Sequence, residues 1–186
     1  EEIDSAERGG LLPRILGRFH LERRKKGPAA LAPPDDPSAA LSDLARLARE
    51  ELGRLPFQGL FWEMECERIL GSPHRGSKGI IELYVETEIG SHARCRPEFF
   101  EVPFGFSRPG ELTDDRLALP ELVIGDGPDT VRIVGRIDRI ETAPDGKARL
   151  ALVVDYKTGS IPKPALIRSF VSLQLPIYMM AIEQAG

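Results

Sequence analysis

The sequence has few cysteines, no long apolar run and no surplus of positive charge, and each absence excludes a class of protein. Its two cysteines, Cys66 and Cys95, lie 29 positions apart without C-x-x-C spacing. Neither a disulfide framework nor a zinc knuckle is therefore indicated, and we expect reduced, structural thiols. No apolar run approaches the roughly 20 residues that cross a bilayer, and no basic-then-apolar leader opens the chain. We expect no membrane partner and a cytoplasmic location.

The formal net charge of −4 gives the chain no general attraction to nucleic acid. DNA binding would therefore depend on local basic patches. The densest one is the run Arg23, Arg24, Lys25 and Lys26. Taken alone, such a run is either a phosphate-binding patch or a solvated helix end.

The composition is that of a soluble globular chain, with 41% hydrophobic and 29% charged residues. A length of 186 residues fits a single domain over 1–186, with a mainly helical part over 1–97 and a strand-rich part over 98–186. The chain begins at Glu1 rather than at Met. We therefore expect it to be a piece of a longer protein.

The first half shows helical periodicity. Apolar residues spaced by three and four predict helices over 6–24 and 38–53, and a third is expected over 60–70. The Gly-rich basic segment 71–79 suggests an exposed loop, with a phosphate cradle as the alternative. Residues 80–90 fit either a helix or a strand.

The second half is rich in β-branched and aromatic residues. We expect an antiparallel meander over 98–157, with turns at 126–129 and at Pro144-Asp145-Gly146, before helical spacing returns after residue 162. Helices, then strands, then helix indicate an α/β (α+β) fold with a mixed central β-sheet flanked by helices.

One strand ends in a cluster of polar residues. In "LALVVDYKTG", Asp155 and Lys157 point to one face and Tyr156 to the other. If the preceding hairpin turn centres on Asp145-Gly146, Asp138 falls opposite Val153 and diagonal to Asp155, within about 7–8 Å.

Two carboxylates so close repel each other, and burial adds to the cost unless a cation lies between them. Lys157 could be that cation in a plain salt bridge. A hard divalent ion such as Mg²⁺ is the alternative, because it takes oxygen ligands and often uses one or two carboxylates. Lys157 would then be left to activate a water or to stabilise charge on a phosphate. Composition does not choose between the two.

Gln174 and Tyr178 are four residues apart and share one face of a helix. They form either a polar cap on an amphipathic helix or a pair of hydrogen-bonding groups that face the site. Pro176 between them is tolerated if it lies in the first helical turn.

The motifs "GRIDRI", "VVDYKTG" and "LQLPIY", within residues 135–178, resemble in order and spacing those of RecB/AddB-type nucleases of the PD-(D/E)XK superfamily. The resemblance implies a restriction-endonuclease-like fold. It also implies Mg²⁺- or Mn²⁺-dependent hydrolysis of DNA phosphodiesters, often coupled to a helicase in recombinational repair.

The resemblance also implies roles for single residues. Asp138, Asp155 and the backbone carbonyl near Tyr156 would hold the metal, and Lys157 would position or activate the nucleophile. The catalytic set that it implies is Asp138, Asp155, Lys157, Gln174 and Tyr178. Candidate phosphate contacts are Arg23, Arg24, Lys25, Lys26, Arg136 and Arg168.

One position departs from the family pattern. Counted from Glu7-Arg8-Gly9, the family's metal-binding His falls on Pro13. His20 lies on nearly the same helical face, but about 10.5 Å further along the axis. Either the metal is held without a His, or the chain is a nuclease-like module that binds DNA or a partner protein without cleavage.

Some family members carry an iron–sulfur cluster, held by one Cys before the opening helix and three after the Gln-Tyr helix. Cys66 and Cys95 match none of these positions. The sequence leaves the presence of a cluster open.

Overall fold

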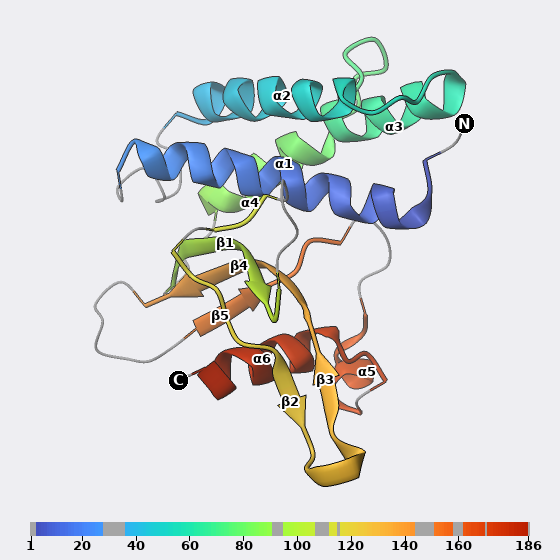
Figure 1. Cartoon of the computed structure of the whole chain (residues 1–186). Helices are drawn as coiled ribbons and strands as arrows, with labels where there is room; N and C mark the ends of the chain where they lie inside the picture. Colours follow the sequence, from blue (N-terminus) through green and yellow to red (C-terminus); the bar gives the residue numbers. More distant parts are fainter. Residues whose placement is uncertain are drawn as a thin grey trace. The chain divides into compact units, whose positions relative to one another are not determined.

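The computed structural model describes residues 3–27, 36–90, 95–106, 112–114, 116–143, 151–157, 162–169 and 171–185. The chain separates into two compact units, Glu1–Ala93 and Arg94–Gly186. In Figure 1 the first unit runs from blue to green, and the second from yellow-green to red.

The first unit is helical. Its described residues form four α-helices, α1 (Ser5–Lys25), α2 (Pro37–Gly53), α3 (Leu60–Leu70) and α4 (Ile80–Gly90). The three helices predicted here are confirmed, and the ambiguous segment 80–90 is a helix. Helix α2 begins at Asp36, whose side chain accepts hydrogen bonds from the backbone N–H groups of Ser38 and Ala39. No helix in the described part of the chain is long and apolar enough to cross a membrane.

Apolar stripes hold these helices together. The apolar stripe predicted for α1 is buried, and its Ile15 and Leu16 are fully inaccessible to solvent. Helix α1 packs against α2, whose Leu44 and Leu47 are also fully buried. Burial of each such side chain contributes about 1.5–3 kcal/mol.

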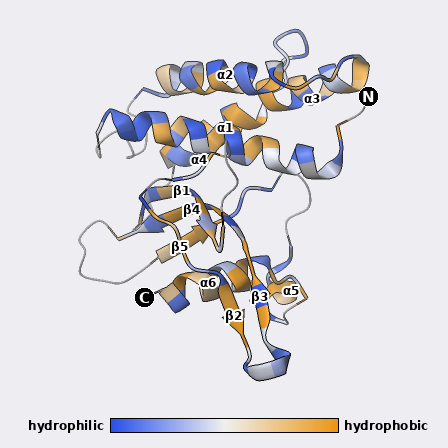
Figure 2. Ribbon diagram, viewed as in Figure 1, coloured by the Kyte–Doolittle hydropathy of each residue, from blue (hydrophilic) through white to orange (hydrophobic). Residues whose placement is uncertain are grey.

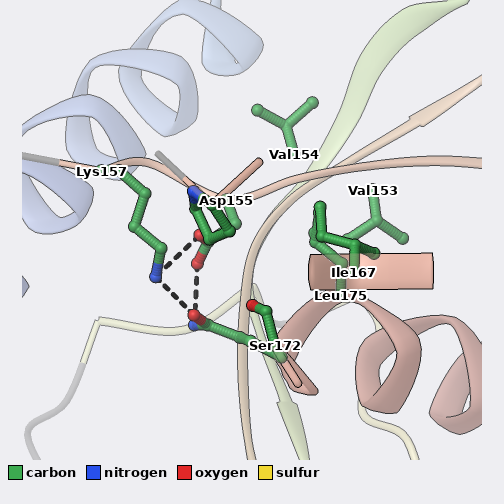
Figure 3. Close-up of a pocket in the computed structure, with 9 residues that line it drawn as sticks. Val153, Val154, Asp155, Lys157, Ile167, Ser172 and Leu175 are labelled. Carbon is green, nitrogen blue, oxygen red and sulfur yellow. Dashed lines mark hydrogen bonds and ion pairs between the residues drawn. The ribbon is translucent and has the colours of Figure 1, made fainter. Parts of the chain in front are cut away.

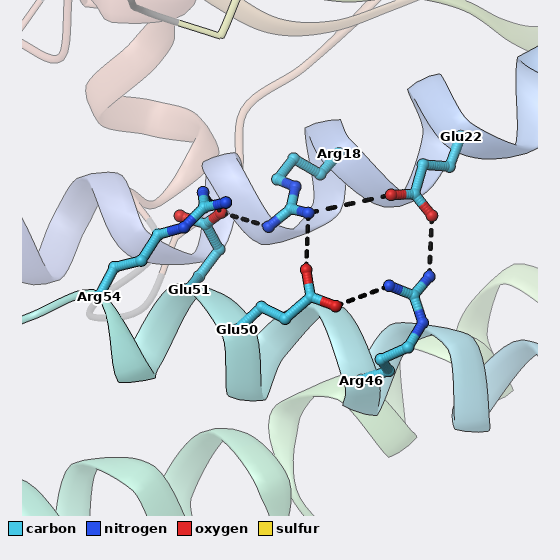
Figure 4. Close-up of polar contacts among 6 residues, drawn as sticks. All are labelled: Arg18, Glu22, Arg46, Glu50, Glu51 and Arg54. Atoms are coloured by element: carbon cyan, nitrogen blue, oxygen red, sulfur yellow. Dashed lines mark hydrogen bonds and ion pairs between the residues drawn. The ribbon is translucent and has the colours of Figure 1, made fainter.

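An ionic network of partly buried and exposed side chains joins α1 and α2 (Figure 4). Arg18 contacts Glu51 at 2.5 Å and Glu50 at 2.8 Å, and Arg46 contacts Glu50 at 2.8 Å and Glu22 at 2.9 Å. Hydrogen bonds from Arg18 and Arg46 lower the pKa of Glu50. Because the charged groups share partners, each helix fixes the side chains of the other.

The second unit is built on two antiparallel sheets. The first has the strand order β1-β4-β5, and the second is a hairpin of β2 and β3 closed by a turn at Gly127–Asp129. The strands are β1 (Arg96–Phe104), β2 (Leu122–Ile124), β3 (Val131–Ile133), β4 (Gly135–Thr142) and β5 (Ala151–Val154). The prediction of one meander over 98–157 is therefore wrong in its connectivity, because β1 pairs with β4 and the β2–β3 hairpin stands apart.

Two glycines explain this topology. Gly135 pairs with Phe104 at the end of the β1–β4 ladder, and a Cβ at Gly135 would lie 2.7 Å from the Phe104 ring. Gly105, with a φ of +90°, turns the chain away directly after β1. The chain then forms a parallel bridge between Phe104 and Leu119 before it enters the hairpin.

The closing helical region divides into α5 (Pro164–Arg168) and α6 (Gln174–Ala185). Pro176 lies in the first turn of α6, where its missing N–H is tolerated. Helix α6 contacts β2 and β5, and its Tyr178 packs edge-on against Phe104 in the core of the second unit. Figure 2 shows hydrophobic colouring along β2 and α6, which contribute to this core together with β1 and β4.

Candidate active site

The pairing of β4 with β5 places two carboxylates side by side. The last pair in the ladder is Arg139 with Val154, so Asp138 and Asp155 come next on the two strands. Residues that face each other across an antiparallel pair lie on the same face of the sheet. The two acidic residues are therefore direct neighbours across the strands.

The predicted register was wrong by two residues. Val153 pairs with Ile140, not with Asp138. The ladder begins at Thr142 and Ala151, so the connection is centred later than Asp145-Gly146, which lie outside the described residues. The shift strengthens the site, because Asp138 and Asp155 become opposite instead of diagonal.

The backbone of Tyr156 links the segment that follows β5 to β4. Its N–H donates to Asp138 Oδ2 at 2.8 Å, while its phenol oxygen accepts from Arg139 Nη1 at 3.3 Å. Arg139 in turn pairs with Glu141, and both side chains are buried. The two hydrogen bonds of Tyr156, one from its backbone and one to its phenol oxygen, thus fix the segment from Asp155 to Lys157 against β4.

Asp155, Lys157, Gln174 and Tyr178 form one hydrogen-bonded chain. Lys157 Nζ contacts Asp155 Oδ2 at 2.8 Å and donates to Gln174 Oε1. Gln174 Nε2 donates to Asp155 Oδ1 and to Tyr178 Oη, each at 2.8 Å. The second interpretation of the Gln-Tyr pair is therefore the one observed: the first turn of α6 faces the strand ends.

Two titratable groups of the site, Asp138 and Tyr178, have raised pKa values. Burial raises the pKa of Asp138 to about 6, and the charge of Asp155 adds to this, while the Tyr156 N–H, Lys157 and Arg136 act in the opposite direction. Burial also raises the pKa of Tyr178 to about 12, although the hydrogen bond from Gln174 lowers it. Burial therefore makes the ionised forms of both side chains unfavourable.

A third carboxylate, Glu101, was missed by the sequence reasoning. It lies in β1 between Phe100 and Val102, whose partners in β4 flank Asp138, and its charge contributes to the raised pKa of Tyr178. Glu101 is fully buried, has a φ of +50° and pairs with Arg136 Nε at 2.9 Å. An acid within the apolar run "FFEVPF" was the signal that could have identified it.

The donor set fits a hard divalent cation. Asp138 in β4 and Asp155 directly after β5 supply neighbouring carboxylate oxygens; burial raises the pKa of Asp138, and the charge of Asp155 adds to this. Mg²⁺ commonly uses one or two carboxylates and completes its coordination with water or substrate phosphate. Within the described ranges, no group of three or more His, Cys, Asp or Glu side chains is placed to hold a metal ion. The protein would therefore contribute these two carboxylates, with the Tyr156 carbonyl as the further ligand implied by the family.

A pocket of about 310 Å³ opens beside these residues. Asp155 and Lys157 lie at one side of it in Figure 3, with Val153, Ile167 and Leu175 at the other. A substrate that reaches Lys157 would therefore also meet an apolar wall.

Pro13 and His20 both belong to α1 of the first unit. Pro13 is buried within α1, and the ring Nε2 of His20 lies 2.5 Å from Tyr84 Oη of α4, also in the first unit. Cys66 is half-buried in α3 and Cys95 is buried before β1, as expected for structural thiols.

The predicted phosphate contacts are distributed over both units. In the first unit Arg23 lies over the Phe19 ring, and Lys26 contacts Asp43 at 3.4 Å. Arg24 is half-buried and Lys25 is exposed. In the second unit Arg168 is exposed in the last turn of α5, next to the pocket residue Ile167, whereas Arg136 is engaged with Glu101.

The family model of the PD-(D/E)XK nuclease superfamily matches residues 1–186. The chain belongs to this superfamily, which confirms the α/β fold class and the resemblance noted in the motifs.

Two relatives from different organisms carry the same name, that of a subunit of an ATP-dependent helicase/deoxyribonuclease. Over 150 residues, 75% of this chain, it is 31% identical to the subunit from Desulforudis audaxviator. Over 64 residues, 34% of this chain, it is 38% identical to the subunit from Bacillus mycoides. The matched regions span 12% and 5% of those proteins. No solved structure matches the chain.

Proposed function

We propose that the chain is a metal-dependent DNA nuclease domain that hydrolyses phosphodiester bonds. The observation that carries the proposal is the placement of Asp138 on β4 opposite Asp155, which directly follows β5, with Lys157 bound to Asp155. The superfamily match and the deoxyribonuclease relatives support it.

We assign a separate role to each side chain of the site. Bound by Asp138, Asp155 and the Tyr156 carbonyl, Mg²⁺ or Mn²⁺ would polarise the scissile phosphate and lower the pKa of a bound water. Lys157 would orient the attacking water and stabilise negative charge on the phosphate. Gln174 holds both Lys157 and Asp155 in position, so we assign it and Tyr178 a positioning role.

The biological setting follows from the relatives' names. We propose that the domain acts with a helicase, in the same parent chain or as a partner subunit, during the repair and recombination of broken DNA in the cytoplasm. Exposed cations such as Lys25 and Arg168 would contact phosphates, and this binding should weaken steeply with salt.

The test is cleavage of linear single- and double-stranded DNA in Mn²⁺. Asp155→Ala and Lys157→Ala should each lower the rate by at least 100-fold, a typical magnitude for loss of a charge-stabilising group. Asp126→Ala and Lys163→Ala, which alter exposed residues of the second unit, are the matched controls and should cleave normally. Undiminished cleavage by Asp155→Ala would refute the assignment.

The second candidate is a nuclease-like module that binds DNA or a partner protein without cleavage. It is favoured by Pro13 at the position of the family His. Calorimetric titration with Mn²⁺ separates the two functions. The nuclease predicts binding that Asp138→Ala removes, whereas the binding module predicts salt-sensitive DNA binding without metal uptake.

A further inference from the structure

The pocket beside the proposed catalytic carboxylates has a polar part and an apolar part. Asp155, Lys157 and Gln174 line its polar part. The rest of the wall is largely apolar and comes from β5, from the segment before α5, and from α5 and α6. Its apolar lining residues are Val153, Val154, Pro162, Ile167 and Leu175.

Apolar side chains also lie exposed beside this wall. Val171 and Leu173, which flank the pocket residue Ser172, are 71% and 49% exposed. A single exposed apolar side chain is ordinary, but exposed apolar residues that adjoin a pocket residue along the chain favour a binding site. The polar lining residues lie at one side of it, so a ligand there would have a charged part and a flat or apolar part.

We propose that this pocket binds one unpaired nucleobase next to the scissile phosphate. The proposal rests on the nuclease function proposed above and adds the form of the substrate: at this position the DNA strand is single or locally opened. The phosphate would lie at Lys157, and the base of the same nucleotide would enter between the side chains of Ile167 and Leu175.

The chemistry of a nucleotide matches both parts of the pocket. The phosphate is anionic and suits the ammonium group of Lys157. The faces of a base are apolar enough to lie against aliphatic side chains, whatever the base. A base within a duplex has both faces covered by its neighbours, so it must leave the stack to enter a pocket. The volume of about 310 Å³ lies at the small end of the range for small-molecule sites, as one base requires.

The polar groups in the wall suggest low sequence preference. The Ser172 hydroxyl can both donate and accept a hydrogen bond, so it can match the edge of any base. The Gln174 amide is already engaged with Lys157, Asp155 and Tyr178. We therefore expect the pocket to distinguish a base from no base, but not one base from another.

The first test measures binding without cleavage. Single-stranded oligonucleotides carrying 2-aminopurine at successive positions are titrated with the chain, with Ca²⁺ in place of Mg²⁺. A base that leaves the stack should change the fluorescence at one position much more than at the others. A uniform change along the strand, or no binding of the oligonucleotides, would overturn the proposal.

The second test uses cleavage in Mn²⁺ of oligonucleotides with one abasic site moved along the strand. The bond next to the abasic site should be cut roughly ten-fold more slowly than the same bond in intact DNA. An unchanged cleavage rate next to the abasic site would refute the base pocket but leave the nuclease function intact. Absence of all cleavage would refute the nuclease function, while the fluorescence test would still decide on the pocket.

A matched pair of variants in α5 assigns the effect to the pocket. Ile167 lines it, whereas the neighbouring Leu166 does not and is 42% exposed. Ile167→Ala should slow cleavage of intact DNA roughly ten-fold yet have little effect next to an abasic site, and Leu166→Ala should change neither. Equal slowing of intact and abasic DNA by Ile167→Ala would contradict the proposal. The abasic scan on the unaltered chain needs no variant and covers the case in which Ile167→Ala does not fold.

Discussion

The backbone N–H of Tyr156 donates to Asp138 Oδ2 at 2.8 Å, and this hydrogen bond ties the segment after β5 to the middle of β4. The bond continues the contact between β4 and β5 past Val154, where two acidic residues that are 17 positions apart face each other. It also satisfies one oxygen of a carboxylate whose pKa burial raises to about 6. A backbone donor, unlike a side chain, cannot be lost by substitution of Tyr156 itself unless proline is introduced.

Asp138→Asn should stabilise the metal-free chain. Because the pKa of Asp138 is raised from 3.8 to about 6 on folding, the folded state binds a proton that the unfolded state has released between these values. Stability therefore falls as pH rises through this window and stays low above it. Asn keeps the acceptor for the Tyr156 N–H without the charge, so the gain at pH 7.5 should be about 1–3 kcal/mol.

Urea denaturation in EDTA at pH 7.5 and pH 4 measures this gain. Most of it should disappear at pH 4, where Asp138 is protonated in the folded state. Asp126→Asn, at an exposed position, is the control and should change stability little at either pH. A variant that is less stable than the native chain at pH 7.5 would contradict the unfavourable burial of this carboxylate.

Gln174→Ala should lower the cleavage rate about 10- to 100-fold, with a smaller effect on stability. Gln174 accepts from Lys157 and donates to Asp155, and without it the ammonium and carboxylate are free to change geometry. Single-turnover cleavage in Mn²⁺ gives the rate, and thermal unfolding gives the stability. Glu183→Ala, on the same helix, should retain the native rate. A native rate in Gln174→Ala would show that Lys157 needs no such support.

Replacing Lys25 and Lys26 by Ser should weaken DNA binding. It should also make the affinity that remains less sensitive to salt concentration. Both side chains are exposed at the end of α1. Each phosphate contact that is lost should reduce the slope of log Kd against log salt by about 1. Fluorescence anisotropy over a range of NaCl concentrations measures the slope. Lys78→Ser is the control, because Lys78 contacts two carboxylates, those of Glu82 and Glu86, whereas Lys26 contacts only that of Asp43 among the ion pairs of the described residues. An unchanged slope would leave the basic run as a solvated helix end.

Glu51→Ala should destabilise the helical unit by about 1–3 kcal/mol, because it removes an acceptor from the partly buried guanidinium of Arg18. The Glu51 side chain is 8% exposed and accepts from Arg18 at 2.5 Å and from Arg54 at 2.6 Å. Chemical denaturation followed by helical circular dichroism measures the loss. Arg49→Ala, at an exposed position of the same helix, should stay within about 0.5 kcal/mol of the native chain.

Local patterns predicted most of the secondary structure. The stripe of Leu12, Ile15, Leu16 and Phe19 identified α1, and Asp36 with Pro37 identified the start of α2, because periodicity and capping act within a few residues. The strand order was not predictable in the same way. The pairing of β1 with β4 depends on the close approach of Phe104 to Gly135, which are far apart in the sequence.

The sequence by itself determined the chemistry of the site: an acid in one strand, a second acid and a lysine just after the next, and then an amide and a phenol one helical turn apart. These residue types and spacings fix what the groups can do. Only the tertiary structure decided which groups meet. Strand register places Asp138 beside Asp155, the fold of β1 brings the buried Glu101 next to this row, and the packing of α6 brings Gln174 to Lys157. Register and packing are set by contacts between distant segments, and the spacing of neighbouring residues does not encode them.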